Sequence, residues 1–179
     1  MYANIHKTLV TLIVSLLYIG ISYAQPKAIG TTYSFSGICI SYEHSVKGDS
    51  FIEAEIKAEL SEVFVNRTDM PGLSTSFTWN YVLKNWTSAE GNEVRMYAGP
   101  GIAAGICKDF KKPSGIFLGL KGRIGTECSF SSRNIIISAC LAPVLGTHVT
   151  LNGKILEMRY YRNGLLNTIM PEVGIRYMF

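Results

Sequence analysis

The sequence predicts an all-β protein, an eight-stranded antiparallel up-and-down β-barrel of one domain. Two observations carry this prediction. After an N-terminal apolar segment, apolar and polar side chains alternate with a period of two, the pattern of strands with two different faces. Seven turn-like stretches then divide the chain into eight parts. The 179 residues suit one domain, and no Lys/Arg run suggests nucleic acid as a partner.

The N-terminus has the parts of a secretory signal peptide. Lys7 precedes an apolar run from Leu9 to Ile21, and Ser22 and Ala24 are small residues at the −3 and −1 positions before Gln25. This run is shorter than the roughly 20 apolar residues of a membrane-spanning helix, which argues against an uncleaved anchor. We therefore expect a cleavable signal peptide at 1–24, a short N-terminal lead at 25–30 and a barrel at 31–179.

The alternation is strongest from Phe51 to Ser61, where five apolar residues oppose mainly charged ones. A helix stays open as an alternative there, because Ile56, Leu60, Val63 and Phe64 also match a helical face. The predicted strands are 31–44, 50–64, 73–86, 93–108, 115–129, 135–150, 154–162 and 166–179. The turns between them fall at 47–49, 69–72, 90–92, 112–115, 131–134, 152–153 and 162–164.

The choice between a soluble and a membrane barrel depends on which face points inward. A soluble barrel has its apolar face inside, whereas a membrane barrel turns it to lipid and keeps a polar lumen. Glycines share the charged face, including Gly99, Gly101, Gly105 and Gly119, which suits a crowded interior better than an open surface. We therefore predict a transmembrane β-barrel whose lumen is filled by charged side chains. The predicted lumen network is Glu43, Glu53, Glu55, Lys57, Glu59, Lys84, Arg95, Lys121, Arg123, Glu127, Glu172 and Arg176.

The last strand carries a family resemblance. Val173, Ile175, Tyr177 and the terminal Phe179 alternate with Glu172, Gly174, Arg176 and Met178. This ending resembles the C-terminal strand of small Gram-negative outer-membrane β-barrel proteins that have no attached periplasmic domain. The resemblance implies a cell outer-membrane location, contact with outer-membrane lipid, and recognition of these four residues by the barrel-assembly machinery. It also leads us to expect a monomer.

Four cysteines, Cys39, Cys107, Cys128 and Cys140, invite a disulfide interpretation in an exported protein, but the expected register does not bring hairpin partners together. We expect free thiols. No C-x-x-C spacing predicts a metal site, and we expect no cofactor.

The predicted function is a structural or surface-interaction role without an open pore and without catalysis. Two alternatives stay open. A lipid-modifying outer-membrane enzyme would need an activated serine, whereas the nearest polar group, His148, Thr150 and Glu157, has none. A secreted lipocalin-like ligand-binding barrel would explain the export signal but not Phe179. Contacts are expected through the turns Lys47–Asp49, Thr87–Asn92 and Ser131–Asn134.

Overall fold

The computed structural model describes residues 27–46, 49–64, 66, 71–109, 113–130, 132–152, 155–166 and 170–179. The expected signal peptide at 1–24 lies outside the described residues. The elements are β1 (Lys27–Ser34), β2 (Gly37–Val46), β3 (Ser50–Glu59), α2 (Ser61–Phe64), β4 (Gly72–Thr87), β5 (Glu93–Lys108), β6 (Ser114–Phe130), β7 (Ile135–Leu141), β8 (Val144–Asn152), β9 (Ile155–Tyr160), α3 (Arg162–Leu166) and β10 (Glu172–Met178). Within these residues, no helix is long and apolar enough to cross a membrane.

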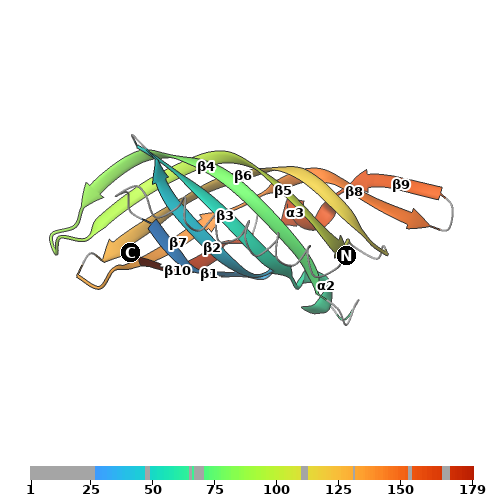
Figure 1. Ribbon diagram of the computed structural model, residues 1–179, viewed down its shortest axis with the longest axis horizontal. Coiled ribbons are helices and arrows are strands. Elements are labelled where there is room, and N and C mark those ends of the chain that lie inside the picture. The colour runs from blue at the N-terminus through green and yellow to red at the C-terminus, as the bar shows by residue number, and fades with distance from the viewer. Residues whose placement is uncertain are drawn as a thin grey trace, which may run out of the picture.

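Eight of the strands form a closed ring in the order β1–β2–β3–β4–β5–β6–β7–β10, and β10 pairs again with β1. Each strand is antiparallel to both neighbours, and the strands cross the long axis of the barrel obliquely (Figure 1). The chain is therefore a closed eight-stranded antiparallel β-barrel, as the alternation and the number of turns predict.

The stagger of the ring follows from its pairing register. From Ile29 the paired residues lead in one direction through Tyr42, Ala54, Phe77, Ile102 and Leu120 to Leu145. In the other direction Ile29 pairs with Tyr177, which pairs with Ile135. β7 and β8 both pair with β6 in the same register, so they follow one another along a single strand line. Leu145 and Ile135 lie ten residues apart on this line, and the barrel therefore has a shear of ten residues. A shear of this size tilts the strands by roughly 40° from the barrel axis.

The predicted first strand, 31–44, is wrong because the segment is a hairpin. β1 and β2 are joined by a turn at Phe35 and Ser36, and Ser34 pairs with Gly37. A Cβ on Gly37 would lie 1.9 Å from the carbonyl oxygen of Ala58, so a larger residue cannot fit there. The Ser-Gly pair at 36–37 is a turn signal that the alternation on both sides obscures.

The predicted strand 154–162 is wrong in its role, because β9 is not a member of the ring. The predicted last strand, 166–179, does close the ring as β10, but it begins only at Glu172. β7 and β8 pair with β6 in one continuous register, interrupted at Ala142 and Pro143. β9 pairs only with β8, and this hairpin projects beyond the ring (Figure 1). The helix α3 separates β9 from β10. Residues 162–166 therefore form a helix, where the sequence predicted a turn at 162–164. The predicted first strand is two strands, β1 and β2, so the ring still has eight members although β9 is not one of them.

The two ends of the barrel differ in structure. One end carries Lys27, Phe179 and the connections between β2 and β3, β4 and β5, and β6 and β7, and we call it the terminal end. The other carries α2, α3 and the β8–β9 hairpin, and we call it the helical end (Figure 1). The helix at 61–64 also shortens the predicted strand 50–64, in the region where a helical face was an open alternative.

Candidate functional site

The outer face of the barrel is apolar. Side chains in the middle of the wall are more than half exposed, for example Ile56 at 61%, Leu118 at 65% and Leu120 at 69%. Aromatic residues add to this outer face: Tyr33, Phe35, Phe77, Trp79, Tyr81, Trp86, Tyr160, Tyr177 and Phe179 are all exposed. A water-soluble barrel would have these residues inside, so the structure has the polarity of a membrane barrel.

The predicted lumen residues, with one exception, point into the barrel. Nine are buried: Glu43, Glu53, Glu55, Glu59, Lys121, Arg123, Glu127, Glu172 and Arg176. Lys57 and Arg95 are nearly so, with side chains 11% and 17% exposed. Lys84 instead lies on the outer face, with its ammonium 5.9 Å from the ring centre of Trp86. A register shift between Val82 and Lys84 turns the side chain outward, and the period-two pattern cannot reveal such a bulge.

Two arginines, Arg95 and Arg176, form the half of the network nearer the terminal end. Arg176 binds three carboxylates, with N–O distances of 2.9 Å to Glu43, 2.9 Å to Glu53 and 2.7 Å to Glu127. Arg95 pairs with Glu43 and Glu127. Because the three acids are shared between arginines on different strands, these contacts tie β2, β3, β5, β6 and β10 together across the lumen.

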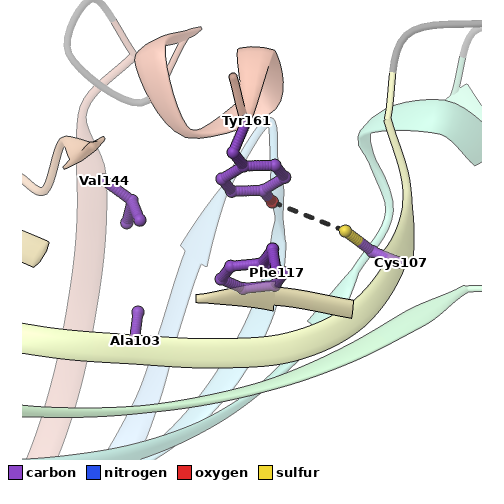
Figure 2. Close-up of a cluster of buried hydrophobic side chains, with 5 residues drawn as sticks. All are labelled: Ala103, Cys107, Phe117, Val144 and Tyr161. Carbon is purple, nitrogen blue, oxygen red and sulfur yellow. Dashed lines mark hydrogen bonds between the residues drawn. The ribbon is translucent and has the colours of Figure 1, made fainter. Parts of the chain in front are cut away.

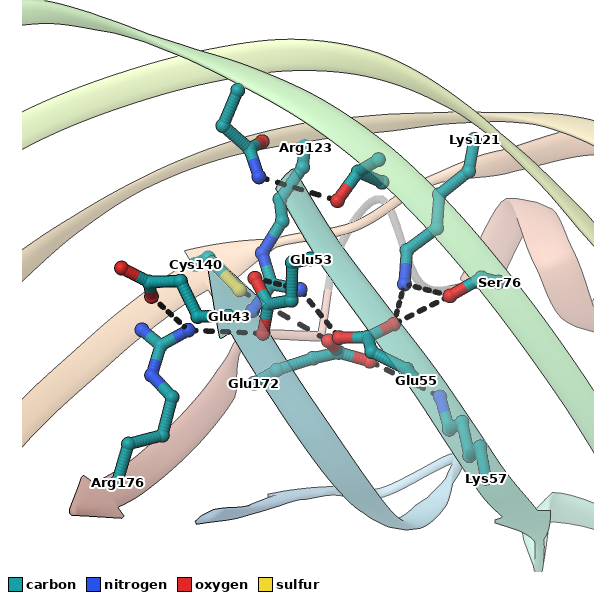
Figure 3. A network of polar contacts seen from close by, with 12 residues as sticks. Glu43, Glu53, Glu55, Lys57, Ser76, Lys121, Arg123, Cys140, Glu172 and Arg176 are labelled. Carbon is teal, nitrogen blue, oxygen red and sulfur yellow. Dashed lines mark hydrogen bonds and ion pairs between the residues drawn. The ribbon is translucent and has the colours of Figure 1, made fainter. Parts of the chain in front are cut away.

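Two lysines form the half nearer the helical end (Figure 3). Lys121 pairs with Glu55 and also donates to Ser76 at 2.9 Å, while Lys57 pairs with Glu172 at 3.1 Å. Arg123 joins the two halves, because it contacts both Glu55 and, at 3.0 Å, Glu53. The inward set therefore holds six acids and five bases, and Glu59 accepts a hydrogen bond from Ser74 at 2.6 Å.

Apolar side chains close the lumen on both sides of the charges. Toward the terminal end, Phe51 and Tyr97 meet edge to face with ring centres 5.1 Å apart. Toward the helical end, Phe117 and Tyr161 stack in parallel at 4.3 Å, beside Ala103, Cys107 and Val144 (Figure 2). A cavity of about 20 Å³ remains between this cluster and the lysines, enough for about one water molecule. The described lumen is packed, as an eight-stranded barrel should be.

The helical end is held to the barrel by buried polar contacts. Both carboxylate oxygens of Asp109 accept backbone hydrogen bonds at the start of α3, from Arg162 at 3.0 Å and Asn163 at 2.9 Å. The Asn163 side chain donates to Glu62 in α2 at 3.3 Å and to the carbonyl oxygen of Lys108 at 3.2 Å. Burial raises the pKa of the Tyr161 hydroxyl, which lies between β9 and α3, well above its ordinary value.

Sequence reasoning did not single out this arrangement. Asp109 and Asn163 lie in segments that look like ordinary turns, and Tyr161 continues an apparent strand. A weak signal exists in Asp109, an acid placed to cap a helix N-terminus, but the helix that it caps starts 53 residues later in the sequence. Only the fold brings the two together.

The remaining residues singled out from the sequence do not belong to the predicted lumen network. His148 is buried, and its Nε2 lies 3.0 Å from the carbonyl oxygen of Cys107, while Thr150 pairs with Glu157 in the β8–β9 hairpin. All four cysteines are free, as expected. Val173, Ile175, Tyr177 and Phe179 are exposed on the outer face of β10 and at its end. The turns 47–49, 87–92 and 131–134 all belong to the terminal end, although Lys47, Gly48 and Ser131 lie outside the described residues.

The chain is thus a small closed barrel with a polar, filled lumen and an apolar outer face. No protein-family model matches it, and no curated protein matches it significantly. Among solved structures it is similar to the N-terminal β-barrel domain of OprF from Pseudomonas aeruginosa, with 13% identity and a TM-score of 0.45 over 87% of this chain and 96% of that chain. The fold assignment rests on the strand register of the chain itself.

Proposed function

We propose that the protein is an integral outer-membrane β-barrel with a structural or surface-interaction role. One observation carries the proposal: charged side chains fill the interior while exposed Ile, Leu, Tyr, Trp and Phe cover the wall. Burying ions inside a soluble protein while leaving the apolar side chains in water would reverse the usual gain from burial. In a bilayer the same distribution is favourable, because lipid covers the wall.

The proposed orientation puts the helical end at the cell surface. Outer-membrane barrels have short turns on the periplasmic side and longer connections outside. In this chain the longer connections, with α2, α3 and the β8–β9 hairpin, belong to the helical end. Surface contacts would then involve this end, rather than the turns 47–49, 87–92 and 131–134 that the sequence suggested.

The lumen supports a role without an open pore. Ion pairs across the lumen link five bases to five of the six inward acids, and Glu59 accepts a hydrogen bond from Ser74. Phe117 and Tyr161 pack on the helical side of these charges. Eight strands leave an interior that side chains fill, whereas aqueous channels belong to barrels of about 16–18 strands. We expect no stable single-channel current.

The two alternatives receive less support. A lipocalin-like barrel binds an apolar ligand inside, but the interior here is charged. For a lipid-modifying enzyme, the group considered from the sequence would have to act through His148, which is 2% exposed and bound to a backbone carbonyl. We therefore propose a protein without catalytic activity, which needs no cofactor.

The proposed partners follow from the outer face. Outer-membrane lipid would surround the belt of apolar side chains. The barrel-assembly machinery would recognise the final strand through Val173, Ile175, Tyr177 and Phe179, whose side chains face outward. The closed ring pairs all eight of its strands within one chain, so a monomer satisfies the barrel.

Three measurements test the proposal. In cell fractionation the protein should sediment with outer membrane and require detergent for release, whereas recovery from the soluble periplasm would refute membrane insertion. In planar bilayers the purified protein should give no stable conductance, and large single-channel currents would refute the closed lumen. Mass spectrometry of lipid A from cells with and without the protein tests the enzyme alternative, which a change in acyl chains would support.

A further inference from the structure

The apolar wall of the barrel contains a groove. It has a volume of about 630 Å³ and crosses the outside of β4, β5, β6 and the β7–β8 line. The outward residues along its floor are small or cyclic: Ala98, Pro100, Gly122 and Pro143. Its sides are Tyr81, Leu120, Ile124 and Leu145, each at least half exposed. The hollow exists because four neighbouring outward positions lack the Ile or Leu found elsewhere on the wall.

The floor is a continuous row across three strand lines. Pro100 pairs with Gly122, and the Gly122 N–H donates to the carbonyl oxygen of Pro143 at 2.9 Å. Both prolines have side chains directed outward, where they line the groove without filling it. Lys121 and Arg123 also border the floor, but their charged groups point inward and bind Glu55 and Glu53. No charged group therefore enters the groove.

Gly122 is open to a larger side chain. A Cβ built there would meet nothing closer than Pro143 Cγ at 3.5 Å, an ordinary contact. At every other strand glycine that the structure describes, a Cβ would come within 3.0 Å of a neighbour. The other glycines are explained by close approach of the chain, whereas packing within the barrel does not require glycine at 122.

We propose that this groove binds one acyl chain of a bilayer phospholipid. The inference rests on the proposed membrane location. If lipid surrounds the apolar wall, lipid also covers the groove within that wall. The groove is uncharged, so it suits a hydrocarbon chain and not a headgroup. It crosses four strand lines at a spacing of about 4.8 Å, a length of roughly 14 Å. One lipid leaflet contributes roughly half of the 30 Å hydrocarbon core. The length of the groove is therefore close to the length of one acyl chain within its leaflet.

Tyr81 gives the bound lipid a direction. It pairs with Ser50, the first residue of β3, and so lies toward the terminal end, whereas Leu145 lies at the other limit of the groove. The phenol is 52% exposed, and a tyrosine at this level can place its hydroxyl near the polar boundary of the bilayer. The acyl chain would enter from the leaflet at the terminal end and run toward Pro143.

The experiment compares lipid retention by native mass spectrometry after reconstitution in phosphatidylethanolamine and phosphatidylglycerol vesicles and release in mild detergent. Gly122→Leu fills the centre of the groove, and Ala98→Leu fills it independently in case the first variant folds poorly. The matched control is Ala54→Leu, the same substitution as Ala98→Leu at an outward position on β3, outside the groove. We expect one retained phospholipid in the wild-type protein and the control, and about tenfold less retention in both groove variants.

Three results would overturn the inference: retention by Gly122→Leu or Ala98→Leu equal to wild type, loss of lipid in Ala54→Leu as well, or an inserted wild-type protein that retains no lipid. A wild-type dimer that the groove variants dissociate would also overturn it, since the occupant would be a second copy. These outcomes are distinct from failure of the proposed function, in which the wild-type protein would not insert into vesicles at all.

Discussion

Replacing Arg176 with methionine should destabilise the barrel strongly. The Arg176 side chain is 1% exposed and holds Glu43, Glu53 and Glu127 at 2.7–2.9 Å. Methionine keeps much of the side-chain volume and removes the charge, so three carboxylates lose a shared partner in a buried site. Breaking a buried ion pair by removing one partner costs about 3–5 kcal/mol. We expect a loss of this size in the free energy of unfolding.

The structure offers a matched control for this change. Arg159 also pairs with a glutamate, Glu157, at 3.1 Å, but its side chain is 56% exposed. Arg159→Met should therefore cost no more than about 1 kcal/mol, the range for exposed ion pairs. Adding Glu53→Gln to Arg176→Met removes one surplus carboxylate, and it should recover part of the lost stability.

Urea titration of the reconstituted protein, followed by tryptophan fluorescence, measures these free energies by linear extrapolation. The two reporters, Trp79 and Trp86, lie on β4, away from β10. A value for Arg176→Met within about 1 kcal/mol of wild type would refute the reasoning, because it would mean that the lumen carboxylates do not depend on this arginine.

Three further predictions concern other parts of the barrel. Ile56→Lys places a charge on the lipid-facing wall and should cost about 2–4 kcal/mol in the same urea titration if Ile56 lies near the midplane; no loss would contradict the assignment of the faces. Deleting Phe179 should lower the fraction of protein inserted in the outer membrane, as measured by fractionation of cells, and unchanged insertion would exclude it from the assembly signal. Asp109→Ala removes the cap of α3 and should cost about 1 kcal/mol, with faster proteolysis near residue 162 as the readout; unchanged proteolysis would show that the cap does not hold the helix.

Much of the barrel is predictable from the sequence because each strand has one apolar and one polar face. That alternation predicts all-β structure and the inward direction of residues such as Glu53, Arg123 and Arg176. These positions depend only on local parity within a strand, which the pairing of neighbouring strands does not alter. The number of eight strands follows from the seven expected turns, and it agrees with the ring because the missed turn between β1 and β2 offsets the counting of β9 as a barrel strand.

The features that were missed depend on breaks in that parity. At Phe35 and Ser36 a two-residue turn reverses the chain, but the apolar positions continue on both sides and conceal it. At Val82–Lys84 a bulge moves Lys84 to the outside, leaving six acids with five bases. The placement of α3 depends on Asp109, more than 50 residues away in the sequence. Such long-range contacts have no local pattern.

The central claim, that lipid covers the apolar wall, can be tested on the unmodified chain. Both tryptophans of the sequence, Trp79 and Trp86, point outward and are 41% and 40% exposed. Trp86 lies beyond Tyr81 toward the terminal end, whereas Trp79 lies on the other side of Tyr81, within the apolar wall. In vesicles of phospholipid brominated on its acyl chains, the fluorescence of Trp79 should therefore be strongly quenched and that of Trp86 weakly quenched, relative to vesicles of the unbrominated lipid. Equal fluorescence in the two kinds of vesicle would mean that the wall does not meet hydrocarbon, and it would contradict the membrane assignment.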